Sequence, residues 1–313
     1  MKNITKDTKV SSEKIKQIDV IFSSDNNYAK HLGVTLCSIF ANKSKEYSIS
    51  IHVIDGGISN KNKNKLKNLE KRYLFNINYI NIKSNEYEDL FTSDHITKAT
   101  YYRISIPNLL NNKIKKILYL DCDLIVLGDL LELFEKSVDN YFIGAVEEKV
   151  SDTKKDLGID EKKPYFNAGV MLMNLNKWRE ANISEKTLSF ARKNPEKIKL
   201  WDQDSLNAIL VDKWLILDNR YNFLTSEIER TLFKKTIGGP GPLVVHYSSS
   251  IKPWKFNGKH PYNDEYFYYL KKTGWNRIFI YTPKMRSVII KTIKLKRSLI
   301  KLIKKPIKKI LKK

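Results

Sequence analysis

Short apolar runs alternate with longer amphipathic segments along the N-terminal part of this chain. Strands that alternate with helices are joined as crossover units, and these build a mainly parallel sheet with helices on both faces. Ligands of such sheets bind at the carboxyl ends of the strands. The sequence therefore predicts an α/β fold, with strands at Ile18–Phe22, Ile49–Ile54 and Ile77–Ile80 and helices at about Ala29–Asn42 and Asn60–Tyr73.

The length of 313 residues fits one large domain or two small ones. A hydrophobic content of 42% and a charged content of 29% are typical of a globular chain rather than a disordered one. No internal repeat or low-complexity linker interrupts the sequence before a strongly basic end. We therefore predict an N-terminal extension at 1–17, a single catalytic or binding domain at 18–284 and a separate tail at 285–313.

Two carboxylates stand two residues apart in the segment Ile117–Val126, where Asp121 and Asp123 flank Cys122. The aspartates come directly after an apolar run that predicts a buried strand, and side chains at i and i+2 of an extended segment point to the same side. Carboxylates that face one point repel each other unless a cation or a proton joins them, and hard divalent ions prefer oxygen ligands. The pattern predicts a metal site suited to a diphosphate, with a turn or a helix cap as the alternative.

Another apolar run ends at His246, six residues before Lys252. In a parallel sheet His246 would emerge at the same edge as Asp121 and Asp123. One imidazole and two carboxylates, completed by phosphate oxygens, suit Mn²⁺, with Mg²⁺ as the alternative metal. No glycine-rich nucleotide fingerprint is present, so a nucleotide would be held in another way. A purely structural histidine is the competing interpretation.

The cysteine content and the N-terminus favour a cytoplasmic protein. Cys37 and Cys122 are far apart and lack the spacing of metal ligands, which predicts reduced thiols. The segment Met1–Asp7 has no apolar core after its charges and so does not resemble a signal peptide. No stretch reaches the roughly 18 apolar residues of a membrane span.

The net charge of +23 is concentrated at the end of the chain, because residues 285–313 contain 12 basic residues and no acidic one. Isoleucines and leucines recur there at spacings of three and four, with lysines between them and Pro306 as a break. This pattern predicts basic amphipathic helices that lie on an anionic membrane surface. A packed terminal helix and a nucleic-acid-binding helix are the alternatives, and the tail lacks aromatic residues for stacking on bases.

Six motifs occur in a fixed order within residues 18–280: Ser24–Ala29, Thr100–Arg103, Tyr119–Asp123, Phe166–Val170, Asp202–Asp204, and His246–Tyr247 followed by Lys252–Trp254. In this order they resemble the motifs of glycosyltransferase family 8, whose retaining enzymes include bacterial lipooligosaccharide galactosyl- and glucosyltransferases.

The resemblance implies a Rossmann-like nucleotide-binding domain of the GT-A type with a mostly parallel mixed sheet, and a UDP-sugar as donor. It implies that the cation, Mn²⁺, bridges the diphosphate, and that Lys252 pairs with a phosphate. By position, it assigns the uracil and ribose to Asp25, Asn27 and Tyr28, the metal to Asp121, Asp123 and His246, the diphosphate to the Asp121–Cys122–Asp123 segment, and the donor sugar to Arg103, Asn167, Ala168, Asp202 and Gln203.

The implied reaction develops positive charge on the sugar, close to Asp202 and Gln203, and negative charge on the departing UDP. A covalent route to retention needs a strong nucleophile beside the anomeric carbon, and Gln203 is a poor one. The sequence therefore favours attack from the leaving-group face, assisted by a UDP oxygen.

Two positions depart from the family pattern. Ser249 occupies a loop where glycine is common and backbone would approach phosphate. Glu147 or Glu148 stands where related enzymes often place an aspartate near the sugar and acceptor. Two predicted site residues also have simpler interpretations: Asp25 could cap the following helix, and Arg103 could be a surface cation or a buried ion-pair partner.

The predicted function is thus transfer of glucose or galactose from a UDP-sugar to a bacterial cell-surface glycan, at the inner face of the cell membrane. The acceptor would be a lipopolysaccharide, a capsule or a glycoprotein glycan, and a protein acceptor or a storage primer remains open. The alternative from another class is a noncatalytic protein that binds nucleic acid or another polyanion, which its acidic cluster disfavours.

Overall fold

A seven-stranded sheet forms the centre of the structure, a computed structural model that describes residues 16–92, 97–150, 152–224, 241–249, 252–255 and 260–275. Its strand order is β3-β2-β1-β4-β7-β6-β8, and among these strands β7 alone runs against its neighbours. The predicted mostly parallel mixed sheet is confirmed. The strands are β1 (Lys16–Ser24), β2 (Tyr47–Asp55), β3 (Ile77–Asn81), β4 (Lys116–Leu120), β6 (Ile143–Glu147), β7 (Phe166–Asn174) and β8 (Trp214–Leu217).

The predicted N-terminal elements are confirmed. Helices α1 (Ala29–Asn42) and α2 (Asn60–Tyr73) have the predicted bounds, and β1, β2 and β3 each extend past the predicted strand by a few residues at most. The ends of α2 follow from local chemistry. The Ser59 side chain accepts a hydrogen bond from the Asn62 backbone N–H at the start, and Leu74 adopts a left-handed conformation after the last turn.

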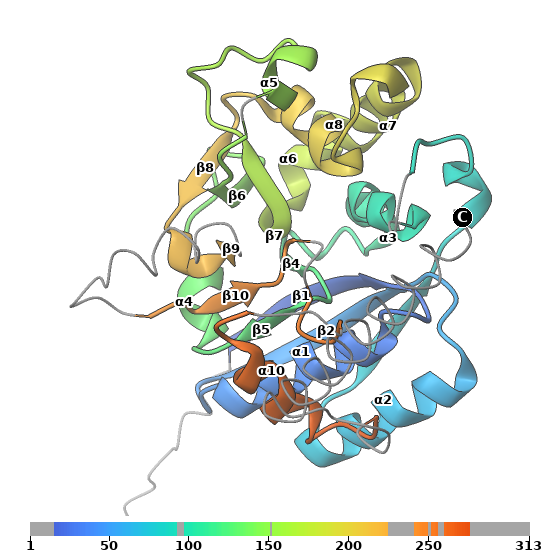
Figure 1. Cartoon of the computed structure of the whole chain (residues 1–313), viewed down its shortest axis with the longest axis vertical. Coiled ribbons are helices and arrows are strands. Elements are labelled where there is room, and N and C mark those ends of the chain that lie inside the picture. Colours follow the sequence, from blue (N-terminus) through green and yellow to red (C-terminus); the bar gives the residue numbers. More distant parts are fainter. Residues whose placement is uncertain are drawn as a thin grey trace, which may run out of the picture.

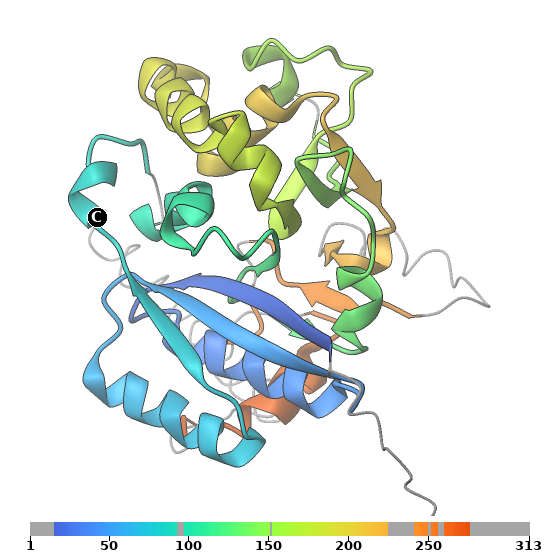
Figure 2. The same ribbon diagram turned by 180° about the vertical axis from the view of Figure 1, so that it is seen from behind.

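Helices cover both faces of the sheet (Figures 1 and 2). On one face α1 packs against α2 and α10. A second core lies on the opposite face, between the sheet and helices that include α6, α7 and α8. The other helices of the described ranges are α3 (Ile106–Leu109), α4 (Leu130–Phe134), α5 (Asp152–Asp156), α6 (Leu175–Glu180), α7 (Ile183–Lys193), α8 (Trp201–Leu210) and α10 (Asn263–Leu270), with 3₁₀ turns η1 (Ser84–Tyr87), η2 (Lys98–Ser105), η3 (Pro195–Lys197) and η4 (Asn219–Tyr221).

A small second sheet, in the order β5-β10-β9, corrects one expectation. The apolar run before the aspartates forms β4, as predicted, and the chain then leaves the large sheet after Leu120, so that β5 (Leu124–Val126) pairs with β10 (Val244–His246). The third strand is β9 (Phe223–Leu224). The two aspartates therefore lie where the sheets meet, and His246 ends a strand of the small sheet rather than the large one.

Several predictions concern residues outside the described part of the chain. These include the N-terminal extension, apart from its last two residues, and the basic tail at 285–313. Within the described ranges, no helix is long and apolar enough to cross a membrane. Both cysteines are free and buried.

Candidate active site

Three side chains converge where the two sheets meet. The Nε2 atom of His246 lies 3.3 Å from Oδ1 of Asp123 and 3.7 Å from Oδ2 of Asp121. One ligand atom from each of the three residues lies within 4.8 Å of the other two. Two carboxylates and one imidazole are a donor set that fits a divalent cation such as Mn²⁺ or Mg²⁺. The two aspartates follow the end of β4 and face one point.

Gly169 of β7 lies directly against this cluster. A Cβ atom at this position would be 2.2 Å from Cε1 of His246 and 2.8 Å from Oδ2 of Asp121. The Asp121 backbone N–H also donates to the Gly169 carbonyl at 2.8 Å. The close approach of the β7 backbone therefore requires glycine here.

Lys252 is buried and bound to the same cluster. Its Nζ lies 2.5 Å from Oδ2 of Asp123 and donates to the Tyr247 carbonyl, also at 2.5 Å. Burial raises the pKa of Asp123, but the charge of Lys252 and the contact with His246 outweigh burial and hold this pKa well below its usual range. Asp123 thus presents one carboxylate oxygen to His246 and the other to Lys252. The sequence predicts only a phosphate partner for this lysine.

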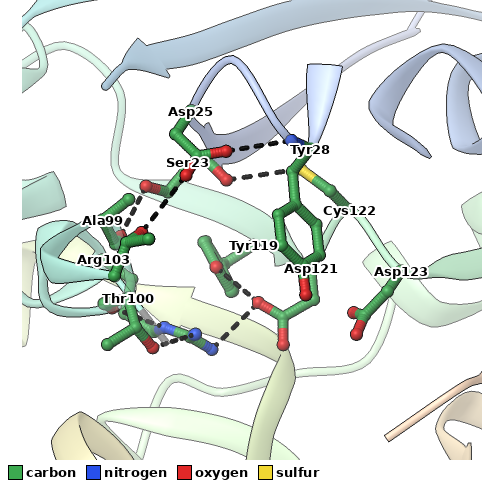
Figure 3. Close-up of a pocket in the computed structure, with 11 residues that line it drawn as sticks. Ser23, Asp25, Tyr28, Ala99, Thr100, Arg103, Tyr119, Asp121, Cys122 and Asp123 are labelled. Carbon is green, nitrogen blue, oxygen red and sulfur yellow. Dashed lines mark hydrogen bonds and ion pairs between the residues drawn. The ribbon is translucent and has the colours of Figure 1, made fainter. Parts of the chain in front are cut away.

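Arg103 connects the cluster to a second acidic residue. Its Nη1 lies 3.1 Å from Oδ1 of Asp121 and donates to the Ala168 carbonyl at 2.8 Å, while its Nε lies 2.8 Å from Oδ2 of Asp202. Burial alone would lower the pKa of Arg103. The charges of Asp121 and Asp202 outweigh burial, and the pKa lies above its ordinary value. Of the interpretations left open by the sequence, the buried ion-pair partner is the one observed (Figure 3).

Asp202 is held at the start of α8 by protein contacts to both of its oxygens. Oδ1 accepts a hydrogen bond from the Thr100 hydroxyl at 2.5 Å, and Oδ2 faces Arg103. The side chain is buried, and burial raises its pKa to about 6 against the opposing charge of Arg103. The preceding residue, Trp201, has a φ of +51°, a strained conformation for a residue with a large side chain.

Gln203 has a fully determined orientation. Its Oε1 accepts from the Ala168 backbone N–H at 2.9 Å, and its Nε2 donates at 2.9 Å to Oε2 of Glu148. The same Glu148 oxygen accepts from Nδ2 of Asn167 at 3.0 Å. Gln203, predicted at the reacting sugar, and Glu148, predicted near the sugar and acceptor, are therefore parts of one hydrogen-bonded group.

Glu147 and Glu148 have different surroundings. Glu147, the last residue of β6, is exposed. Glu148 lies beside Gln203, and both residues line a hollow described below. Side chains alternate between the faces of an extended segment, so adjacent glutamates point in different directions.

Two adjoining hollows surround these residues (Figure 3 shows the first). We call them the Asp25 hollow and the Gln203 hollow after a residue that lines each, and they share Tyr28, Thr100, Arg103 and the two aspartates. Most predicted site residues line one or both: Asp25, Tyr28, Arg103, Asp121, Cys122, Asp123, Asn167, Asp202, Gln203, His246 and Lys252.

Three predicted residues do not line either hollow within the described ranges. Asn27 is exposed in the turn before α1. Ala168 is buried and contributes its backbone N–H and carbonyl to Gln203 and Arg103. Ser248, rather than Ser249, lines the Gln203 hollow.

Asp25 closes a turn and also lines one of the hollows. Its Oδ1 accepts from the Tyr28 backbone N–H at 2.9 Å, which closes the turn that leads into α1. The same side chain lines the hollow named after it, from which the Tyr28 ring extends toward the aspartates (Figure 3).

Sequence reasoning missed two residues that touch the proposed ligands. The Tyr119 hydroxyl donates to Oδ1 of Asp121 at 2.6 Å, and Oδ1 of Asn222 lies 3.0 Å from Nδ1 of His246. Tyr119 belongs to an apolar run and was counted only as part of a motif. Asn222 precedes a two-residue strand, so no periodic pattern marked it.

Comparisons with known proteins agree with this architecture. The sequence profile of glycosyl transferase family 8 matches residues 19–258. General stress protein A of Bacillus subtilis is 38% identical over 271 residues, which are 83% of this chain and 95% of that protein. Lipopolysaccharide 1,3-galactosyltransferase of Salmonella typhimurium is 26% identical over 279 residues, 85% of this chain and 82% of the other.

A solved structure extends the likeness to three dimensions. The crystal structure of the galactosyltransferase LgtC in complex with donor and acceptor sugar analogs superposes with a TM-score of 0.75 at 25% identity, and the match covers 82% of this chain and 96% of LgtC. The fold and the site thus define a glycosyltransferase of the GT-A type. This chain belongs to glycosyltransferase family 8.

Proposed function

We propose that the protein is a retaining, metal-dependent transferase that moves glucose or galactose from a UDP-sugar to a bacterial cell-surface glycan. The observation that carries this proposal is the cluster of Asp121, Asp123 and His246, with Lys252 attached, at the junction of the two hollows. A nucleotide on one side and a sugar on the other would place the diphosphate at the cluster.

In this proposal the Asp25 hollow holds the uridine. Tyr28 offers an aromatic face that extends from the turn before α1, and Asp25 offers carboxylate oxygens to polar groups of the uracil or ribose. Asn27 would contribute from the exposed turn beside them. Cys122 lies between the metal ligands and would offer its backbone to the diphosphate.

The leaving group would be stabilised at the cluster. A divalent cation held by the two aspartates and His246 offsets the negative charge that develops on the departing UDP. The Lys252 ammonium has three N–H donors, of which two go to Asp123 and Tyr247, so one can meet a phosphate oxygen. Lys252 thus adds a positive charge where the diphosphate departs.

The sugar would occupy the Gln203 hollow, where Asn167, Gln203 and Glu148 present amide and carboxylate groups. Both oxygens of Asp202 are held by Arg103 and Thr100, which disfavours a covalent intermediate on that residue. We therefore retain attack from the leaving-group face, with a UDP oxygen that takes the proton of the acceptor hydroxyl. Asp202 would act indirectly, because it holds the Arg103 guanidinium that also pairs with Asp121.

The acceptor is proposed from two kinds of support. Similar proteins include a lipopolysaccharide 1,3-galactosyltransferase and a lipopolysaccharide 1,2-glucosyltransferase of Escherichia coli. The basic amphipathic sequence of 285–313 would bring the enzyme to a lipid-borne acceptor at the inner face of the cell membrane. A lipid-linked glycan is therefore favoured over a protein acceptor.

A panel of UDP-sugars tests the activity directly, because slow Mn²⁺-dependent release of UDP without acceptor would already distinguish an enzyme from a binder. Isothermal titration with UDP in the presence of Mn²⁺ tests the site. Equal UDP binding by the wild type and by Asp123→Ala, or none by either, would reject the metal-bridged diphosphate. A polyanion-binding protein would instead bind nucleic acid without Mn²⁺ and lose that binding steeply with salt.

The tail has its own test. Replacement of Lys304, Lys305, Lys308 and Lys309 by glutamine should reduce flotation of the full chain with anionic liposomes while UDP binding is kept. Unchanged flotation would show that these lysines do not attach the protein to the membrane.

A further inference from the structure

A buried asparagine connects the proposed metal ligand His246 to the proposed sugar site. Asn222, which is 1% exposed, follows η4 and lies between His246 and Asn167. Its Oδ1 is 3.0 Å from Nδ1 of His246, and its Nδ2 donates at 2.9 Å to Oδ1 of Asn167. No sequence motif pointed to this residue, and the function proposed above gives it no role.

The orientation of the Asn222 amide follows from fixed donors at the other end of the chain of hydrogen bonds. The Gly169 backbone N–H donates to Oδ1 of Asn167 at 2.9 Å, so this Asn167 atom is an acceptor. The other end of the Asn167 amide faces Oε2 of Glu148, which requires an NH₂ group there. Asn222 must therefore present its own NH₂ to Asn167 and its oxygen to His246.

An amide oxygen can only accept, so the atom of His246 that faces it must carry a proton. A neutral imidazole has one protonated nitrogen, and the other holds the lone pair that binds metals. We propose that Asn222 is a positioning residue, which keeps the proton on Nδ1 of His246 and leaves Nε2 as the nitrogen that faces Asp121 and Asp123. This inference rests on the metal site of the proposed function.

The same chain of contacts reaches the sugar side of the site. From Asn222 it passes through Asn167 to Glu148, whose Oε2 also accepts from Gln203. The imidazole orientation and the Gln203 orientation are therefore set by one network that begins at a backbone N–H of β7. Partners that orient metal-binding histidines in this way typically change metal affinity by about 10–100-fold when removed.

Nuclear magnetic resonance of protein labelled with ¹⁵N only at its five histidines reads the proposed proton directly. The signals of His246 are assigned by their loss in His246→Gln. We expect Nδ1 of His246 to carry a proton, both without metal and with diamagnetic Mg²⁺ added. An unprotonated Nδ1 would overturn the proposal, whatever the protein does with UDP-sugars, so failure here is distinct from failure of the proposed function.

A second measurement follows Mn²⁺ binding by electron paramagnetic resonance, with Mn²⁺ alone as the probe. Asn222→Leu removes the acceptor and should weaken Mn²⁺ binding by about 10–100-fold. Asn222→Asp keeps an oxygen toward His246 and should retain the Nδ1 proton. The matched control is Asn42→Leu, because Asn42 makes three side-chain hydrogen bonds remote from the site.

Asn42→Leu should lose stability without a change in Mn²⁺ affinity. Wild-type affinity in folded Asn222→Leu would overturn the proposal, as would equal losses of affinity in Asn222→Leu and Asn42→Leu. If Asn222→Leu does not fold, the Nδ1 signal of the wild type and of Asn222→Asp still decides the question.

Discussion

A methyl group on Gly169 would lie 2.2 Å from Cε1 of His246, far inside van der Waals contact. The backbone of β7 and the imidazole ring are thus packed against each other with no space for a side chain. The Gly169 carbonyl also accepts a hydrogen bond from the Asp121 backbone N–H. Gly169 therefore helps to position two of the three proposed metal ligands, His246 and Asp121.

Gly169→Ala should therefore displace His246 and Asp121 and weaken Mn²⁺-dependent UDP binding by at least about tenfold, the lower end of the range for disturbed metal shells. Isothermal titration of UDP with Mn²⁺ present measures the effect. Gly241→Ala is the matched control, because a Cβ there meets no atom within 4 Å. Wild-type UDP binding by Gly169→Ala would show that the cluster tolerates the shift.

Lys252 is expected to act on the leaving group rather than on folding alone. Lys252→Met keeps most of the buried stem but removes the charge beside Asp123, so UDP-sugar turnover should fall by about 100-fold, as for loss of one preorganised donor. Steady-state UDP release at saturating Mn²⁺ measures this. Lys255→Met alters an exposed lysine three residues away and should leave turnover unchanged. Equal rates for both variants would remove Lys252 from the mechanism.

The fold could be predicted from sequence where local chemistry determines it. The bounds of α2 follow from Ser59 at its start and from the change of periodicity around it. The break of the segment 117–126 into β4 and β5 could not be predicted, because both halves are apolar and the partner of β5 is the distant strand β10. Long-range pairing, rather than local preference, decides that division.

Arg103 should contribute strongly to stability because it lies between two carboxylates in the interior. Removing one partner of a buried charge pair typically costs about 3–5 kcal/mol, since the remaining charges lose their compensation. Arg103→Met leaves Asp121 and Asp202 without this cation, so urea unfolding should show a loss in that range. The surface pair Arg192–Asp89 provides the contrast, and Arg192→Met should cost about 0–1 kcal/mol. Similar losses in the two variants would mean that burial of Arg103 adds nothing.

A buried histidine should make the protein sensitive to acid. Burial lowers the pKa of His260 from 6.5 to about 4, and its Nδ1 accepts from the Tyr262 backbone N–H. Between these pH values His260 binds a proton in the unfolded chain but not in the folded protein. The free energy of unfolding therefore falls as the pH drops from 6.5 toward 4, by up to about 1.4 kcal/mol per pH unit from this group.

The free energy of unfolding is measured in urea from about pH 7 down to about pH 4, a range that covers both pKa values of His260. His260→Gln keeps an acceptor for the Tyr262 N–H but does not titrate, so its stability should decline less steeply over the same window. Parallel curves for the variant and the wild type would exclude His260 as a source of acid sensitivity.

The candidate site was predictable to the extent that side-chain chemistry stands next to a strand in the sequence. Asp121, Asp123 and His246 could be chosen from such positions. The partner of Lys252 and the pairing of Arg103 with Asp202 could not, because these residues lie 129 and 99 positions from their partners. Asn222 was beyond reach for the same reason, since its role depends on two residues that the fold alone brings to it.

Glu148 should influence which donor sugar the enzyme accepts. Its Oε2 accepts hydrogen bonds from both Asn167 and Gln203. Glu148→Asp shortens the side chain by one methylene and should release both amides, which widens the Gln203 hollow. The ratio of the rates with UDP-glucose and UDP-galactose should then change by about 10-fold, as is typical of a lost polar contact of about 1–2 kcal/mol. Glu147→Asp makes the same change on the neighbouring exposed side chain and should leave the ratio as in the wild type. The assay compares UDP release from the two donors at equal concentration for all three proteins. A ratio that moves in Glu147→Asp as much as in Glu148→Asp, or in neither, would show that donor choice is made elsewhere in the hollow.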